Sequence, residues 1–419
     1  MNIFNDVPAS DTIPAPLDKP SIAVLPFDNL SGDQEQDYFA DGMTEDIITG
    51  LSRFRSLFVI ARNSSFSYKG KSPDVRDVAR DLGVRYVLEG SVRRSGNRVR
   101  ITGQLVDAET GNHLWAERYD RDLDEIFVVQ DEVTEAIVAA IAPEIDEVER
   151  SRAQRKPPDS LDTWTLFQRG LVDYYATTKE SLEAAIKLFD EVNERDPSFA
   201  PAFAMAADAR VRLFMHNSMD YAADGNSLLN QAREKARLGV TLDARDQSCL
   251  WADGRAHSYL GYHDIAIAKA EEAVALNPSS AMAHHTLGFV LGRAGRFEEA
   301  IRHIERAMQL SPRDIFTAGF LTVGSYVLFK MGNYQKALDW ARRSTRSPNP
   351  RWQSFATLVA SFMILDRQDE AAVAVSDLLA HRPTISLGEI RNQFNETFPN
   401  SIEGNSLFVD ALREAGLPE

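Results

Sequence analysis

The chain has 419 residues, with 46 Lys and Arg against 62 Asp and Glu, so its formal net charge is −16 at pH 7. This acidic excess disfavours binding to the phosphate backbone of nucleic acids. The one cysteine, Cys249, excludes an intrachain disulfide framework and a cysteine-rich metal site. The length predicts two or three domains of about 100–200 residues each.

Residues 1–19 lack the basic start and the apolar run of a signal peptide, and we expect them to form a flexible leader. No later stretch has about 18 consecutive uncharged apolar residues, so the sequence predicts no membrane span. We therefore expect a cytoplasmic protein, or a periplasmic one if a membrane-spanning segment precedes this sequence.

The segment 20–150 begins with alternating strand-like and helix-like stretches. The apolar runs 21–27 and 57–62 predict buried strands. Between them, residues 37–54 carry an apolar side chain at every fourth position, which predicts a helix that packs one face on a sheet. A second helix is expected over residues 73–83, because Pro suits its first turn and Gly its end.

Three further strands are predicted between residues 86 and 120, because turn residues at 95–97 and 110–112 separate segments in which polar and apolar residues alternate. A final helix over residues 123–149 has an apolar stripe. The resulting order, βαβαβββα, predicts a compact α/β domain with a mixed sheet, since the first strands need helical crossovers while the last three can pair as hairpins.

The C-terminal part repeats every 34 residues. That interval separates Pro278 from Pro312 and Gly261 from Gly295, and it is the tetratricopeptide period. After a linker at 151–160, we expect about six helical pairs over residues 161–383 and capping helices over 384–419. Neither helix of a pair can bury its apolar face alone, so the pairs must stack into an all-α superhelical solenoid.

The two parts together resemble a known family. The resemblance is to the TolB-like N-terminal domain that precedes tetratricopeptide repeats in many bacterial proteins, and it rests on segments such as PSIAVLPFDNLSGD, YFADGMTEDIITGLSRF and VLEGSVRRSGNRVRITGQLVDAETG. In that family the pair of domains commonly follows a class III adenylate cyclase domain or a winged-helix DNA-binding domain. The resemblance therefore implies a sensory or regulatory role. A cyclase domain would need about 200 residues before Pro20, so we expect either a stand-alone relative or a fragment that lacks its output domain.

Resemblance to other tetratricopeptide arrays implies that the first helix of each pair lines a concave surface. The side chains predicted to bind a partner there are Trp251, Arg255, Ser258, Met282, His285, Phe289, Tyr326 and Phe329. Such a strip suits an extended peptide or an amphipathic helix with some acidic character, through apolar anchors and a charge-assisted bond from Arg255. Alternatively, Trp251 and Phe289 merely fill the space between repeats.

No motif in the sequence indicates catalysis. The nucleophile-elbow, zinc-protease and dinucleotide fingerprints are absent from it, so we expect no enzyme activity, no cofactor and no metal. The alternating arginines Arg93, Arg94, Arg98 and Arg100 could bind an anion, but they are more typical of the solvated face of a β-ribbon.

The leading hypothesis is thus a non-catalytic interaction and regulatory scaffold that binds a protein or peptide. One alternative is the regulatory portion of an adenylate cyclase or transcription regulator whose output domain is absent from this sequence. Another is a small-ligand sensor, with a site at the carboxyl ends of the strands 22–27 and 57–61. Self-association is also expected to be possible through the exposed edges of the hairpin sheet.

Overall fold

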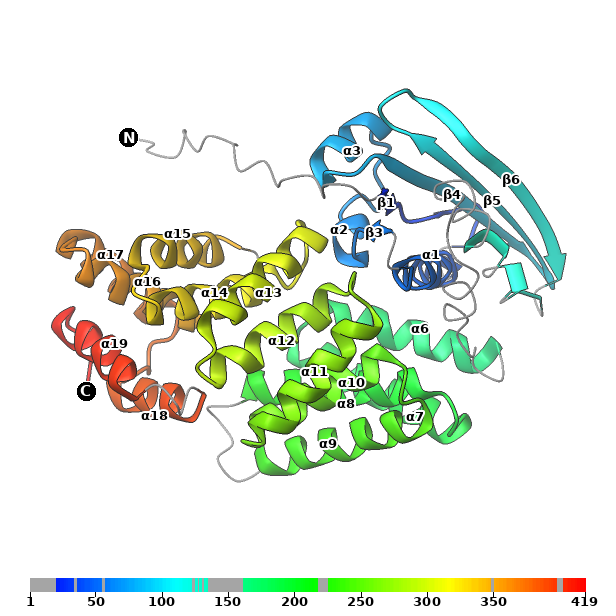
Figure 1. The fold of residues 1–419 in the computed structure, drawn as a ribbon. Coiled ribbons are helices and arrows are strands. Elements are labelled where there is room, and N and C mark those ends of the chain that lie inside the picture. Colours follow the sequence, from blue (N-terminus) through cyan, green and yellow to red (C-terminus); the bar gives the residue numbers. More distant parts are fainter. Residues whose placement is uncertain are drawn as a thin grey trace.

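The computed structural model describes residues 20–33, 36–54, 57–122, 125–126, 128–129, 132–134, 161–217, 225–347, 350–397 and 402–419. Figure 1 shows a mixed sheet with its helices at one end of the molecule and a curved array of helices at the other. The predicted fold class, an α/β domain followed by an all-α solenoid, is confirmed. None of the described helices is both long and apolar enough to cross a bilayer.

The sheet has parallel and antiparallel halves. Its strands are β1 (Ser21–Val24), β2 (Asp28–Asn29), β3 (Phe58–Val59), β4 (Tyr86–Ser95), β5 (Arg98–Asp107) and β6 (Asn112–Asp122). The order is β3-β1-β4-β5-β6, with β2 paired to β4. β1 runs parallel to β3 and β4, whereas β4, β5 and β6 form antiparallel hairpins. The hairpin turns contain Gly96 and Gly111, both with positive φ, as the sequence predicted.

Helices cover both faces of this sheet. The predicted every-fourth-residue stripe lies on α1 (Asp37–Ser52), where Phe39, Met43, Ile47 and Leu51 are buried in the same apolar cluster as β1 and β5. The opposite face packs on α3 (Val75–Leu82), which begins with an Asp74 cap and ends at Gly83 in the left-handed conformation.

Two short elements were missed from the sequence, β2 and α2 (Arg62–Phe66), because two and five residues are too few to display a period. The predicted final helix is described only in part. Its apolar residues Ile126, Val129 and Val133 pack against the inner face of the sheet, and the remainder of residues 123–149 lies outside the described residues.

The solenoid consists of antiparallel helix pairs. They are α6 (Leu161–Ala176) with α7 (Lys179–Arg195), α8 (Ala200–Asn217) with α9 (Gly225–Leu242), α10 (Gln247–Tyr259) with α11 (His263–Leu276), α12 (Ala281–Arg293) with α13 (Phe297–Leu310), α14 (Thr317–Lys330) with α15 (Tyr334–Thr345), and α16 (Trp352–Ile364) with α17 (Gln368–His381). The chain ends in α18 (Leu387–Thr397) and α19 (Ile402–Glu414).

The 34-residue landmarks have a steric basis. Gly295 adopts φ +82° in the turn between α12 and α13, and Asp366 adopts the same left-handed conformation between α16 and α17. A Cβ on Gly288 would lie 2.6 Å from Ile304 Cγ1 and 2.9 Å from the Ala300 carbonyl oxygen. The close crossing of α12 and α13 therefore requires glycine at this position.

Candidate functional site

The α/β domain packs directly against the solenoid. Two loops between repeats, 277–280 and 311–314, make this contact at equivalent positions of consecutive repeats. In the first loop the Asn277 side chain donates a hydrogen bond to Ser52 Oγ (2.9 Å), and Ser279 Oγ donates to the Leu57 carbonyl (3.4 Å). The repeat period thus places matching loops against one face of the α/β domain.

The second loop makes more of these bonds. Asn63 Nδ2 donates to Asp314 Oδ1 at 2.9 Å, the Arg313 amide donates to Ser64 Oγ at 2.6 Å, and Arg313 forms an exposed ion pair with Asp81 at 2.9 Å. Hydrogen-bonded atoms that are buried on both sides fix the relative position of two domains more strongly than exposed charges do. The β3–α2 segment is therefore held on the solenoid.

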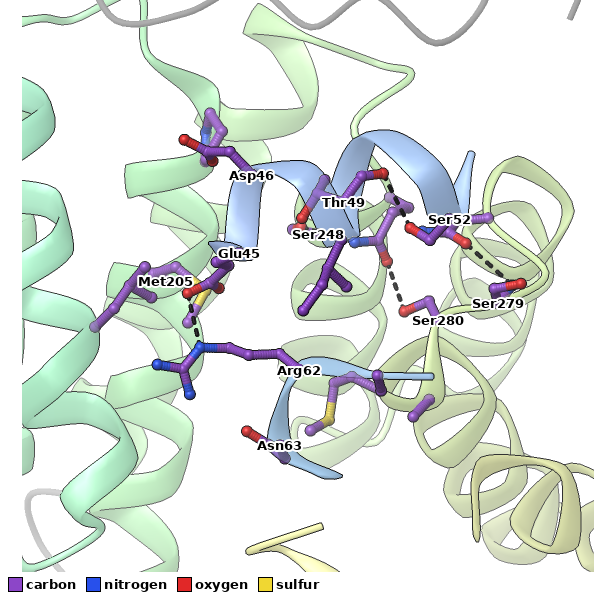
Figure 2. A pocket seen from close by; sticks show the side chains of 18 of the residues that line it. Glu45, Asp46, Thr49, Ser52, Arg62, Asn63, Met205, Ser248, Ser279 and Ser280 are labelled. Atoms are coloured by element: carbon purple, nitrogen blue, oxygen red, sulfur yellow. Dashed lines mark hydrogen bonds and ion pairs between the residues drawn. The ribbon is translucent and has the colours of Figure 1, made fainter. Parts of the chain in front are cut away.

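A partly open cavity of about 170 Å³ lies at this contact. Its walls come from α1, from the β3–α2 segment and from the first helices of several repeats, so that Thr49, Ser52, Arg62 and Asn63 face Ser248, Ser279 and Ser280 across it (Figure 2). Trp251 and Met282, two of the predicted partner-binding residues, also line this space. Part of the concave face therefore contacts the chain's own α/β domain.

An ion pair spans the cavity wall. Arg62 Nε lies 2.9 Å from Glu45 Oε2, and its guanidinium is stacked between the rings of Phe66 and Tyr175 at 3.8 and 3.9 Å. Tyr175 donates a hydrogen bond to Glu45 Oε1 (3.3 Å), and burial together with that carboxylate raises the pKa of Tyr175. This wall is rigid and polar.

The cavity lining carries more acid than base. Asp46 accepts a hydrogen bond from Trp164 Nε1 (3.0 Å), and Asp314 lies at the opposite wall. Burial raises the pKa of Asp314, although the Phe316 amide and Asn63 hydrogen-bond to it and act in the opposite direction. With hydroxyl groups from several serines beside these carboxyls, the cavity suits a small polar ligand that donates hydrogen bonds.

A second cluster lies farther along the concave side. Asp208 on α8 is completely buried and accepts hydrogen bonds from Tyr174 Oη (2.5 Å), Arg212 Nε (2.7 Å) and Arg255 Nη1. Burial alone would raise the pKa of Asp208, but the charges of Arg255 and Arg212 outweigh it and hold the pKa below its usual value. One carboxylate thus serves two guanidinium groups.

A third guanidinium, that of Arg351 before α16, has no hydrogen bond or ion pair within the described part of the chain. Burial lowers the pKa of Arg351 to about 10, and the charges of Arg212 and Arg255 act in the same direction. Nearby His285 stacks on Phe320 with ring centroids 4.5 Å apart, and neither of its ring nitrogens has a hydrogen-bond partner among these residues. Burial holds the pKa of His285 well below its usual value. The positive charges of Arg255, Arg212 and Arg351 act in the same direction.

We call Arg212, Arg255, Arg351 and His285, with Asp208, the concave cation cluster. The charged members comprise three guanidinium groups and one carboxylate, in a chain whose overall charge is strongly negative. Cations with incomplete compensation in a desolvated position are costly to fold. The cluster is therefore chemically suited to receive an anionic group.

The predicted concave strip is not one continuous open surface. Arg255 and Ser258 are buried on α10, and Phe289 packs on Tyr259 with centroids 5.3 Å apart. Tyr326 and Phe329 lie beneath the C-terminal helices, where both rings make edge-to-face contacts with Phe408 of α19. Helices outside the repeats therefore cover Tyr326 and Phe329, and partner binding by the eight predicted residues stays a prediction.

The sequence pattern did not identify several residues of the cavity and of the concave cation cluster. Asp208 and Arg212 lie in a repeat whose period is obscured by an insertion, and Arg351 precedes its helix, where the repeat pattern assigns no inward position. Glu45 and Arg62 belong to different elements and meet only after folding. The sequence of α8 does contain an indication of this cluster. Two arginines and an aspartate are unusual in an otherwise apolar helix unless they form ion pairs.

The other candidate sites have ordinary partners. In the hairpin, Arg100 pairs with Asp120 (2.7 Å), and Arg94 donates to Gln36 (3.3 Å). His284 and His303 share a hydrogen bond between their Nδ1 atoms (2.9 Å). Within the described ranges, no group of His, Cys, Asp and Glu has the arrangement of a metal site.

Comparison with known protein families separates the two domains. Residues 18–136 match the family of the HilA/YgeH-like transcriptional regulator, second domain, and residues 281–314 match the tetratricopeptide repeat. The chain contains tetratricopeptide repeats and is homologous to HilA-like regulators and to a cyclase-like protein. The finer assignment of a TolB-like N-terminal domain stays a prediction.

Two curated relatives have different names. The chain is 49% identical over 231 residues to "Putative adenylate cyclase 3" of Rhizobium meliloti (strain 1021), which covers 54% of this chain and 38% of that protein. It is 22% identical over 296 residues to "Transcriptional regulator HilA" of Salmonella typhimurium, which covers 70% of this chain and 51% of the regulator. The chain therefore spans about half or less of these relatives.

Among solved structures, the chain is similar to PilF of Pseudomonas aeruginosa, with a TM-score of 0.40 and 19% identity over 53% of this chain and 93% of that one. A structure of the APC/C hetero-tetramer Cut9-Hcn1 has a TM-score of 0.44 and 15% identity, and covers 68% of this chain and 52% of that one. TolB from Acinetobacter baumannii has a TM-score of 0.25 and 20% identity over 32% of this chain and 31% of that one.

Proposed function

We propose that this chain is a non-catalytic regulatory region whose solenoid binds a protein partner through the concave cation cluster. Its relatives are named for two different outputs, cyclic nucleotide synthesis and transcription. A region shared by proteins with different outputs is best explained as the part that senses or recruits. On this proposal, an output domain of either kind lies outside these 419 residues.

The proposal includes a division of the chain and a location. Residues 20–150 form a TolB-like domain, 151–160 a linker, 161–383 the repeats and 384–419 the capping helices, and the protein acts in the cytoplasm. The packing of loops 277–280 and 311–314 on the α/β domain supports a module in which the two domains act together.

The observation that carries the proposal is the charge imbalance of the cluster. The Arg351 guanidinium has no hydrogen bond or ion pair with any of the described residues, and Arg212 and Arg255 share Asp208. A carboxylate from a peptide segment, either a side chain or a C-terminus, would supply the missing negative charge and a bidentate acceptor. We therefore expect the partner segment to be acidic. Apolar residues beside its carboxylate would contact Phe289.

Fluorescence anisotropy tests this expectation with two labelled peptides of equal length, one rich in Glu and Leu and one rich in Lys and Leu. The acidic peptide should bind, and Arg351→Gln should weaken its binding by about tenfold or more, because a charge-assisted hydrogen bond contributes about 1.5–3 kcal/mol. Arg302→Gln, on the exposed side of α13, is the matched control and should leave the affinity unchanged. Equal binding of both peptides, or equal effects of both substitutions, would contradict the proposal.

A second function is favoured by the position of the cavity. Residues 59–63, at and after the carboxyl end of β3, line it together with residues of the solenoid, and β3 belongs to one of the two strands, 22–27 and 57–61, that the sensor hypothesis named. A small polar ligand bound there would bridge α1 to the solenoid and stabilise their contact.

Thermal-shift screening of the full chain against small polyols and amines tests this sensor function. A ligand should raise the melting temperature of the wild type, and the cavity-filling substitution Met282→Trp should abolish that shift. Leu407→Trp, at an exposed position on α19, is the control and should keep the shift. A shift that survives Met282→Trp would place the ligand elsewhere.

A further inference from the structure

The edge strand β6 is long, and none of the described strands pairs with its outer side. It has eleven residues, and β5 is its one neighbour in the sheet formed by the described strands. In Figure 1 it lies on the outer side of the α/β domain, away from the solenoid. Natural proteins usually shorten, cover or block such an edge, because its free backbone groups pair readily with another strand.

Symmetry limits how two copies of β6 could pair. Two antiparallel edge strands that join their sheets are related by a two-fold axis perpendicular to the sheet, so each side chain stays on its own face. Residues directly opposite each other must point to the same face, and therefore one residue of β6 must lie opposite its own copy. Each possible register is then defined by that central residue.

The charges along β6 favour the register that places opposite charges directly across from each other. The segment from Glu117 to Arg121 reads Glu-Arg-Tyr-Asp-Arg. With Tyr119 at the centre, Glu117 faces Arg121 of the second copy and Arg118 faces Asp120 of the second copy, and each pair occurs twice. Registers centred on Glu117, Arg118 or Asp120 instead place identical charges directly opposite, which is unfavourable.

We propose that this chain forms a two-fold symmetric homodimer in which the β6 strands pair in antiparallel orientation about Tyr119, so that the two sheets become one. Backbone hydrogen bonds would supply the attraction and the charge pattern the register. The interface lies at the far side of the sheet from loops 277–280 and 311–314, so dimerisation and the concave cation cluster are separate features.

The present contacts of these side chains permit the rearrangement. Arg118 lies 3.2 Å from Asp120 Oδ2 with its own side chain 63% exposed, and Arg121 lies 3.5 Å from Glu132 Oε2. Exposed ion pairs of this kind contribute little to stability and can be exchanged for others. Tyr119 itself is buried in the core of the sheet domain and keeps the strand in place.

Sedimentation equilibrium of the full chain over a concentration series tests the proposal. The wild type should dimerise, and Glu117→Arg should raise the dimer dissociation constant by about tenfold or more, because it sets Arg against Arg121 twice. The double variant Glu117→Arg with Arg121→Glu reverses both charges and should restore the constant to within about threefold of the wild type.

Two control variants separate charge from other effects. Tyr119→Phe removes the hydrogen bond that Tyr119 donates to Glu117 (2.8 Å) without changing a charge, and it should dimerise like the wild type. Glu298→Arg makes the same charge change at an exposed position on α13 and should do so as well. In the dimer, amides within residues 116–122, the part of β6 that pairs with its copy, should gain hydrogen-exchange protection as the protein concentration rises.

A wild type that stays monomeric up to roughly 100 μM, or a double variant no better than Glu117→Arg alone, overturns the proposal. Concentration-independent exchange in residues 116–122 of a dimeric wild type likewise overturns it, because the dimer would then form through another surface. The peptide-binding test of the proposed function does not depend on any of these results.

Discussion

Two groups of arginines in this molecule have similar sequence signals and different surroundings. The hairpin arginines are largely exposed and have partners on neighbouring elements: Arg100 pairs with Asp120 on β6, and Arg94 donates a hydrogen bond to Gln36 before α1. In the concave cation cluster, Arg212 lies 3.8 Å over the ring of Phe316, and Arg212 and Arg255 share the single carboxylate of Asp208.

The difference between these two groups shows that the burial of arginine side chains indicates a binding surface better than their number does. Water and salt screen the hairpin charges, so nothing further is needed to stabilise them. The guanidinium groups of the concave cation cluster are less hydrated. Their excess of positive over negative charge therefore lowers the stability of the folded chain. Three predictions test this contrast, beginning with the largest expected effect.

Removing the central carboxylate should have the largest effect. Asp208→Asn leaves Arg212 and Arg255 buried without a counter-charge, and we expect the free energy of unfolding to fall by about 3–5 kcal/mol in urea denaturation. The same substitution in the hairpin, Asp120→Asn, removes an exposed partner of Arg100 and should leave the unfolding free energy almost unchanged. Similar losses in both variants would remove the distinction between the two groups.

Two histidines, His284 and His257, differ in the same way in their pKa values. Burial lowers the pKa of His284 to about 4, and the positive charges of His303 and Arg306 act in the same direction. By contrast, the hydrogen bond with Asp253 raises the pKa of His257 above its usual value. A buried imidazole without a neighbouring carboxylate therefore stays neutral, whereas an imidazole beside a carboxylate is protonated more readily.

The sign of the stability effect follows from these shifts. As the pH falls below about 6.5, His284 takes up a proton in the unfolded chain but not in the folded one, so its contribution to stability is lost between pH 6.5 and pH 4. Relative to His284→Gln, the wild type should lose about 2 kcal/mol of unfolding free energy between pH 7 and pH 5. His257 contributes in the opposite direction, with its stabilisation complete below its unfolded pKa and lost as the pH rises through its folded pKa.

Proton-resolved NMR titration of the imidazoles checks both assignments. A midpoint for His284 near that of a free histidine would show that the pair with His303 opens in solution. His257→Gln is the matched control, because it removes an imidazole from the neighbouring repeat and leaves the His284–His303 bond in place.

What could be predicted from the sequence depended on local periodicity. The glycines at 261 and 295 and the prolines at 278 and 312 identified α10 to α13, since each acts through a local turn or helix end. The stripe on α1 identified its buried face in the same way. These features depend on residues that are close in the chain.

The rest depended on contacts between distant residues. Asn63 and Asp314 are separated by 251 positions, so the loop that meets the α/β domain could not be distinguished from any other loop between repeats. Tyr326 occupies the inward position predicted for it, but α19 covers it through Asn405 and Phe408. Periodicity predicts which way a side chain faces within its repeat, and it does not predict what lies opposite.

The smallest expected effect is also the one that links stability to binding. Replacing Arg351 by Met removes a partly buried cation that forms no ion pair with the described residues, and the unbranched side chain keeps much of its packing against α14. We expect the free energy of unfolding to rise by about 1 kcal/mol in urea denaturation while binding of the acidic peptide is lost, because natural binding sites often retain strain that function requires. Arg302→Met on the exposed side of α13 should change neither quantity. If Arg351→Met instead destabilised the chain, the guanidinium would already have a counter-charge in the folded protein, and the concave cluster would then resemble the hairpin arginines.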